Sequence, residues 1–127
     1  MNEVTIFRYE DMIFEYPHQD DRGESVGTQS IARLVCEDHS TTIGAGLARY
    51  DGCTVDWTLL YDEVIAVLGG IFRMRYGDPL GDPVELMPGD VVWLKKGTRM
   101  TYEGDAATIF YAVYPVDWRS KHALGEL

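Results

Sequence analysis

The chain has 127 residues, of which 46% are hydrophobic and 25% charged. This composition predicts one folded domain and argues against disorder. Its 21 acidic and 11 basic residues give a formal net charge of −10, which disfavours nucleic acid and anionic membrane surfaces as partners. No apolar run approaches the roughly 20 residues that span a bilayer. The N-terminus also lacks the basic and apolar regions of a signal peptide, so we expect a cytoplasmic protein.

The first thirty residues are expected to form an arm and a loop outside the main body. Residues 4–16 alternate weakly between apolar and polar side chains, which predicts an edge strand. The polar stretch 18–30 predicts an exposed loop. We therefore divide the chain into an arm and loop at 1–30, a body at 31–116 and a C-terminal tail at 117–127.

The body is a series of short β-type runs separated by turn residues, among them Asp51-Gly52 and Gly69-Gly70. The expected strands are 31–35, 42–50, 55–60, 63–68, 71–76, 91–94, 99–103 and 106–114. With the arm, this spacing indicates roughly nine or ten strands and an all-β sandwich or barrel. The tail is expected to be one short helical turn or to lack regular structure.

Two cysteines, Cys36 and Cys53, are too few for a disulfide framework. One bridge is possible, but we expect both residues to be reduced thiols. Cys36 and His39 have a Cys-x-x-His spacing, which can belong to a zinc site. A lone pair of this kind in an acidic loop favours a structural turn.

Two stretches resemble the paired motifs of a cupin barrel. The first runs from Gly52 through Glu63 to Gly70, and the second is the Pro-Gly-Asp turn, apolar strand and Lys-Gly turn of residues 88–97. Residues 57–63 read W-T-L-L-Y-D-E, and residues 110–118 end an aromatic strand with proline and tryptophan, as in EutQ-type cupins of ethanolamine utilisation. The resemblance implies an all-β fold, a single-domain cupin double-stranded β-helix or jelly-roll barrel, and a homodimer.

Metal-binding cupins place two histidines before the glutamate and a third on the second motif. The corresponding positions here hold Trp57, Leu59 and Met100, or Asp56 and Thr58 in a register one residue longer. The histidines of this chain, His18, His39 and His122, fall in loops and the tail. Since imidazoles and carboxylates usually bind catalytic divalent metals, we expect neither a His-ligated metal nor another cofactor.

Glu63 is the one ligand position of the family pattern that this chain keeps. Alternate strand residues share a face, so Tyr61, Glu63, Ile65 and Val67 should point together, and the resemblance directs that face inward. Burial among apolar neighbours would raise the pKa of Glu63 and make it a general acid or base, oriented by Tyr61 or another tyrosine. Alternatively, Glu63 bonds a tyrosine or arginine and only stabilises the barrel.

The remaining site candidates are residues expected near the barrel interior, where each could instead pack in the core. The expected ligand-binding residues are Asp56, Trp57, Trp93, Met100, Tyr102 and Tyr111. Tyr50 is a further aromatic expected there. Lys95, Lys96 and Arg99 surround the second motif and could meet an anion, although solvated loop charges are the simpler interpretation.

Two functional classes remain open. One is a cupin enzyme, without the usual metal, acting on a small metabolite in or near an ethanolamine-type catabolic pathway. The other is a non-enzymatic module that binds a small molecule or a partner protein in or at the barrel. The resemblance also implies acetate kinase activity, but the sequence has no phosphate-binding glycine loop with an adjacent Lys-Ser/Thr. Longer family members carry a further region ahead of the cupin domain.

Overall fold

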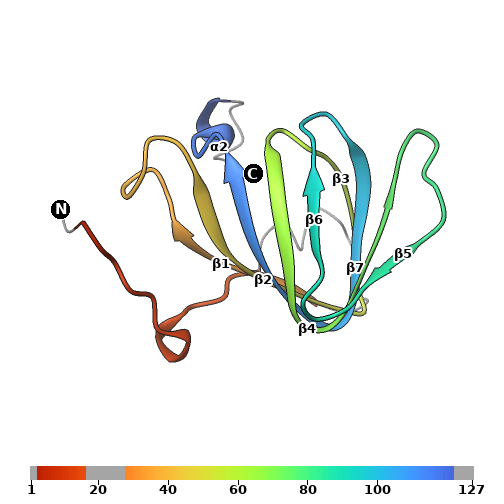
Figure 1. Ribbon diagram of the computed structural model, residues 1–127, viewed down its shortest axis with the longest axis horizontal. Coiled ribbons are helices and arrows are strands. Elements are labelled where there is room, and N and C mark those ends of the chain that lie inside the picture. The colour runs from red at the N-terminus through yellow and green to blue at the C-terminus, as the bar shows by residue number, and fades with distance from the viewer. Residues whose placement is uncertain (1–2, 17–27, 122–127) are drawn as a thin grey trace.

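The computed structural model describes residues 3–16 and 28–121. Within them, seven strands form one antiparallel sheet that curls around its own core (Figure 1). The elements are η1 (Tyr9–Asp11), β1 (Thr28–Val35), β2 (Gly44–Asp51), β3 (Thr54–Thr58), β4 (Asp62–Tyr76), β5 (Val84–Leu86), β6 (Val91–Leu94), β7 (Arg99–Tyr114) and α2 (Trp118–Lys121). The all-β prediction is confirmed.

Two long strands, β4 and β7, form the frame of the barrel and bend at the same level. They pair from Asp62 opposite Tyr114 to Tyr76 opposite Met100, with register shifts around Gly69. At the bend Gly70 has a φ of 68°, and a Cβ there would lie 2.1 Å from the Ala106 carbonyl oxygen. The predicted strand ends at 68–71 and 103–106 are therefore wrong: both are bends inside continuous strands.

The bends divide the sheet into two halves that face each other. The first half of β4 pairs with β6, and the second half of β7 pairs with β2, which in turn pairs with β1. The other halves of β4 and β7 pair with β5 and β3 respectively. The short strand β5 was not predicted, because the Gly-Asp-Pro turns that precede it obscure its pattern. The core between the halves contains Phe72, Leu59, Ile65, Met100, Ile109 and Val67, all less than 2% exposed.

The N-terminal arm is not the predicted edge strand. It contains a short 3₁₀ turn and meets the sheet through one β-bridge, between Glu15 and Ile31 (Figure 1). Arg49 of β2 holds the arm, because its guanidinium lies 3.6 Å from the centroid of the Phe14 ring. Of the predicted loop 18–30, residues 18–27 lie outside the described part of the chain, and residues 28–30 belong to β1.

Of the two alternatives expected for the tail, the structure has the helical turn, α2, and residues 122–127 lie outside its described part. In the part of the chain that the structure describes, no helix is long and apolar enough to cross a membrane.

Cys36 and Cys53 are not joined to each other, and the Cys53 thiol donates a hydrogen bond to the Thr28 carbonyl at 3.0 Å. The Cys36 carbonyl accepts hydrogen bonds from the amides of His39 and Ser40, as expected of a structural turn.

Candidate functional site

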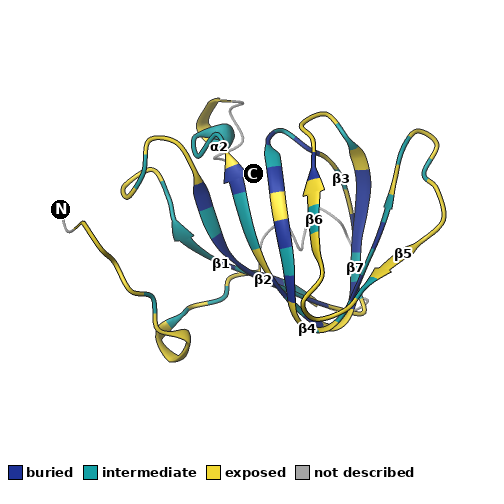
Figure 2. Ribbon diagram, viewed as in Figure 1, coloured by how far each residue is buried: buried dark blue, intermediate teal, exposed yellow. Residues whose placement is uncertain are grey.

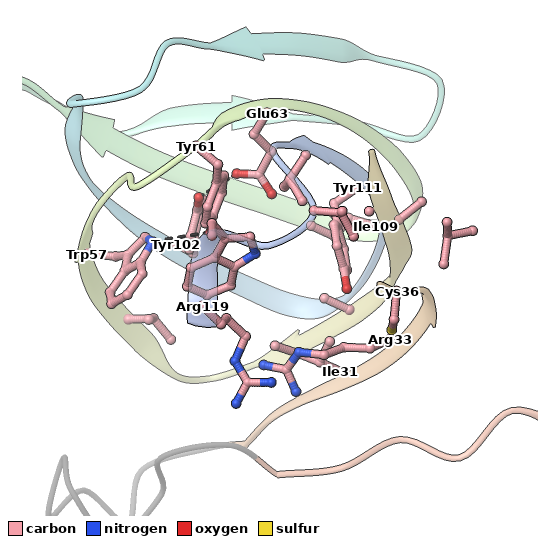
Figure 3. Close-up of a pocket in the computed structure, with 18 of the residues that line it drawn as sticks. Ile31, Arg33, Cys36, Trp57, Tyr61, Glu63, Tyr102, Ile109, Tyr111 and Arg119 are labelled. Carbon is pink, nitrogen blue, oxygen red and sulfur yellow. Dashed lines mark hydrogen bonds between the residues drawn. The ribbon is translucent and has the colours of Figure 1, made fainter. Parts of the chain in front are cut away.

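A pocket of about 250 Å³ opens into the barrel between the curved sheet and α2 (Figure 3). Its lining comes from β1, β2, β3, β4, β7 and the C-terminal turn. The residues labelled in the close-up are Ile31, Arg33, Cys36, Trp57, Tyr61, Glu63, Tyr102, Ile109, Tyr111 and Arg119. Its volume lies just below the roughly 300–1,000 Å³ of pockets for drug-sized ligands, which suits a small metabolite.

Glu63 lies at the inner end of this pocket, near the start of β4. Together with Ile65 and Val67 it forms the predicted inward face, and its side chain is almost fully buried. The Tyr102 hydroxyl donates a hydrogen bond to Glu63 Oε1 at 2.7 Å. Burial raises the pKa of Glu63 from its ordinary 4.5 to about 7, against the lowering effect of that hydrogen bond. Glu63 can therefore gain or lose a proton near neutral pH.

The tyrosines around Glu63 stay protonated. Burial, followed by the nearby Glu63 carboxylate, raises the pKa values of Tyr50, Tyr61 and Tyr102 well above 10. Tyr102 is fixed by ring packing, because its ring stacks on Phe72 and lies 5.9 Å from that of Tyr50, measured between centroids. The phenol groups can therefore serve as hydrogen-bond donors that hold the Glu63 carboxyl in place.

Tyr61 belongs to the aromatic wall of the pocket. It does not form the hydrogen bond to Glu63 that the alternation of side chains along the strand alone would favour. Its hydroxyl accepts a hydrogen bond from Trp57 Nε1 at 3.2 Å. Its ring lies 4.8 Å from that of Trp118, which in turn contacts Trp57 edge to face. The Trp118 side chain thereby attaches the C-terminal turn to the barrel and closes one side of the pocket.

Of the predicted site residues, the structure brings six to the pocket: Tyr50, Trp57, Tyr61, Glu63, Tyr102 and Tyr111. Met100 lies on the same sheet face as Trp57, its cross-strand neighbour, but core side chains cover it completely. Its predicted place in the ligand site is therefore wrong. The pKa of Tyr111 rises to about 12, mainly through burial, so this phenol also stays neutral.

Trp93 and Asp56 are also wrongly placed by the sequence prediction. Trp93 is opposite Val64, whose side chain points outward, and directly opposed residues share a face, so 60% of Trp93 is exposed. Asp56 alternates with Trp57 and therefore also points outward, where its carboxylate meets Arg99 Nη2 at 3.0 Å. This ion pair also explains the position of Arg99. Asp62, on the outer face next to Glu63, accepts a hydrogen bond from the Lys96 amide at 2.8 Å.

Sequence reasoning missed two arginines at the outer end of the pocket. Arg33 shares one face of β1 with Gln29, Ile31 and Val35, and it is the single charge on that face, which was the available signal. Arg119 belongs to the tail, where no periodic pattern marks it. Burial and the nearby positive charge of Arg33 lower the pKa of Arg119.

The family of the chain follows from a comparison with known proteins. Residues 14–120 match the family described as "Ethanolamine utilisation protein EutQ". The chain belongs to the EutQ family. Among curated relatives, "Acetate kinase EutQ" of Salmonella typhimurium is 31% identical over 88 residues, and the protein of the same name from Clostridioides difficile is 30% identical over 86. The matches cover 68% and 67% of this chain but only 37% and 53% of those relatives.

Solved structures agree with this assignment. The Clostridium difficile EutQ protein has a TM-score of 0.71 and 27% identity, covering 84% of this chain and 78% of that one. An RmlC-like cupin from Methanocaldococcus jannaschii, described as a double-stranded β-helix, has a TM-score of 0.61 at 12% identity, with 87% and 96% coverage. The EutQ-type domain of this chain is thus a cupin barrel.

The donor groups around Glu63 do not fit the divalent metal that many cupins hold. In the described ranges, no cluster of three or more His, Cys, Asp or Glu side chains could bind a metal ion. The polar groups lining the pocket next to Glu63 are phenols with raised pKa values, and neutral phenols are poor ligands for such ions. The chemistry of the site therefore has to be considered in terms of its carboxyl, phenol and guanidinium groups.

Proposed function

We propose that this EutQ-type cupin binds a small metabolite in the barrel pocket and transfers a proton through Glu63 without a metal ion. The observation that supports the proposal is a carboxyl group, almost fully buried, lining a pocket and having a pKa near 7. A general acid or base works best when its pKa lies near the operating pH. Family membership supports a metabolite of ethanolamine-type catabolism.

In this proposal Glu63 is the catalytic residue and Tyr102 is a positioning residue. The Tyr102 hydroxyl holds one carboxyl oxygen of Glu63, which leaves the other oxygen able to face a ligand. Tyr61 and Trp57 form the wall against which the apolar part of the ligand packs. The printed acetate kinase name belongs to relatives of which this chain spans about half or less, and the proposal does not depend on it.

The test begins with a thermal-shift screen of the purified chain against ethanolamine, acetate and ATP, representing an amino alcohol, a short carboxylate and a nucleotide. The compound that binds is then assayed for turnover with wild type, Glu63→Gln and Tyr102→Phe. We expect Glu63→Gln to lower turnover at least tenfold, or about 1.4 kcal/mol, while the fold is retained. Tyr102→Phe should shift the pH profile of turnover, since it removes the hydrogen bond to Glu63.

Two results would contradict the proposal. Binding of a compound with no turnover, equally strong in wild type and Glu63→Gln, would favour a non-enzymatic binding module. A stoichiometric divalent metal ion found by elemental analysis of protein purified without chelators would contradict the metal-free mechanism.

A further inference from the structure

The two arginines of the pocket come from distant parts of the chain and meet at its outer end. Arg33 is in β1 and Arg119 is in the C-terminal turn, yet both line the pocket. Figure 3 shows their guanidinium groups side by side, on the opposite side of the pocket from the Glu63 carboxyl. The positive charge of Arg33 is close enough to lower the pKa of Arg119.

No carboxylate of the described residues forms an ion pair with either arginine, and Glu15 has the smallest of the effects on the pKa of Arg119, which it raises. Among the salt bridges of residues 3–16 and 28–121, none includes Arg33 or Arg119. Glu37 also lines the pocket, but the contact of its carboxylate is a hydrogen bond from Ser120 Oγ at 3.4 Å. Two adjacent cations that are partly buried repel each other and lose hydration, so this arrangement costs free energy.

Two other arginines of this acidic chain have carboxylate partners, and a third lies over an aromatic ring. Arg73 forms two hydrogen bonds to Asp105, at 2.9 and 2.8 Å. Arg99 pairs with Asp56, and Arg49 lies over the Phe14 ring. A chain with a net charge of −10 has carboxylates to spare, so the uncompensated pair in the pocket marks a place for a negative charge from outside the chain.

We propose that the pocket recognises its ligand by an anionic end, a carboxylate or a phosphate, bound between the guanidinium groups of Arg33 and Arg119. Guanidinium groups bind both anions with paired, charge-assisted hydrogen bonds. The rest of the ligand then extends along the aromatic wall toward Glu63. This proposal deepens the proposed function and rests on it only for the identity of the binding pocket.

The test measures binding of three simple probes by isothermal titration calorimetry: inorganic phosphate, acetate and the uncharged acetamide. We expect phosphate, acetate or both to bind wild type, with affinity that falls as salt is added, and acetamide not to bind. Arg33→Gln and Arg119→Gln should each weaken anion binding at least tenfold. Arg99→Gln is the matched control, because its guanidinium lies on the outer surface, and it should bind as wild type does.

Binding of phosphate alone or acetate alone identifies which anion the site prefers. The absence of binding by both, or equal binding by wild type and the two pocket variants, overturns the proposal. A purely structural role for the arginines would lower the melting temperature of the unliganded variants; the proposal expects it unchanged or higher, since substitution relieves the repulsion. Glu63→Gln should still bind the anion, so loss of its turnover alone bears on the proposed function and not on this inference.

Discussion

At the scale of single residues, the proton on Glu63 links the site to stability. The pKa of Glu63 is about 7 in the folded chain and 4.5 ordinarily, so between these values the folded state binds more protons than the unfolded state. The contribution of Glu63 to stability is therefore complete below pH 4.5 and is lost as the pH rises through 7. Glu63→Gln removes this dependence, because glutamine does not titrate.

The measurement is the free energy of unfolding in urea for wild type and Glu63→Gln between pH 5 and pH 8. Relative to wild type, the variant should gain about 2–3 kcal/mol over this range, at about 1.4 kcal/mol per pKa unit. The contributions of the other ionisable groups to the free energy of unfolding are the same in both proteins, so they cancel in the difference. Parallel curves for the two proteins would show that the Glu63 carboxyl titrates normally when folded.

The sequence was sufficient to identify Glu63 as an inward carboxyl, but it did not identify the tyrosine that donates a hydrogen bond to it. Strand alternation placed Tyr61 on the same face, and an adjacent tyrosine was the natural choice. The actual donor, Tyr102, comes from β7, and which residue of β7 faces Glu63 depends on how two bent strands cross in space. Arg119 was unpredictable for a related reason: its place depends on how the tail packs through Trp118.

At the scale of elements, the bend shared by β4 and β7 depends on one glycine. Gly70→Ala would bring a Cβ to 2.1 Å from the Ala106 carbonyl oxygen in a backbone conformation that disfavours side chains. We expect a loss of at least about 2 kcal/mol in unfolding free energy. The matched control is Gly69→Ala, where nothing lies within 4 Å of the added atom, and the loss should stay under about 0.5 kcal/mol.

Urea unfolding of both variants would check this. Equal losses at the two positions would mean that the bend does not require a left-handed residue. The sequence signal at Gly69-Gly70 was real, but a glycine pair marks a turn and a bend equally well. The alternating pattern resumes from Phe72, and only the continuous pairing with β7 distinguishes the two possibilities.

At the scale of the whole molecule, apolar surface remains without cover. The outer face of β6, β4 and β7, defined by Val64, Val91, Trp93 and Phe110, is 37–65% exposed (Figure 2). The N-terminal arm is similarly exposed at Val4, Ile6 and Ile13, which are 67–79% exposed. Contiguous apolar patches of this kind mark contact surfaces, and we predict that a second copy of the chain covers them in a homodimer.

Light scattering after size exclusion tests the homodimer. Trp93→Lys should shift the chain toward monomer, because a charge would be buried in the interface, and removal of residues 1–14 should do the same. Lys96→Ala, next to β6 but outside the apolar face, is the control and should leave the dimer intact. A dimer that persists in both test variants would exclude these surfaces as the interface.

The position of β7 in the chain also governs how the protein is made. β7 follows the other described strands in the chain, so a ribosome produces it after β2, β3 and β4, all of which pair with it. Before its synthesis, β1 can pair with β2, and β4 with β5 and β6, but no strand joins these two groups and β3 has no partner strand. The nascent chain therefore presents open strand edges that chaperones can bind, and the barrel closes only when β7 is inserted.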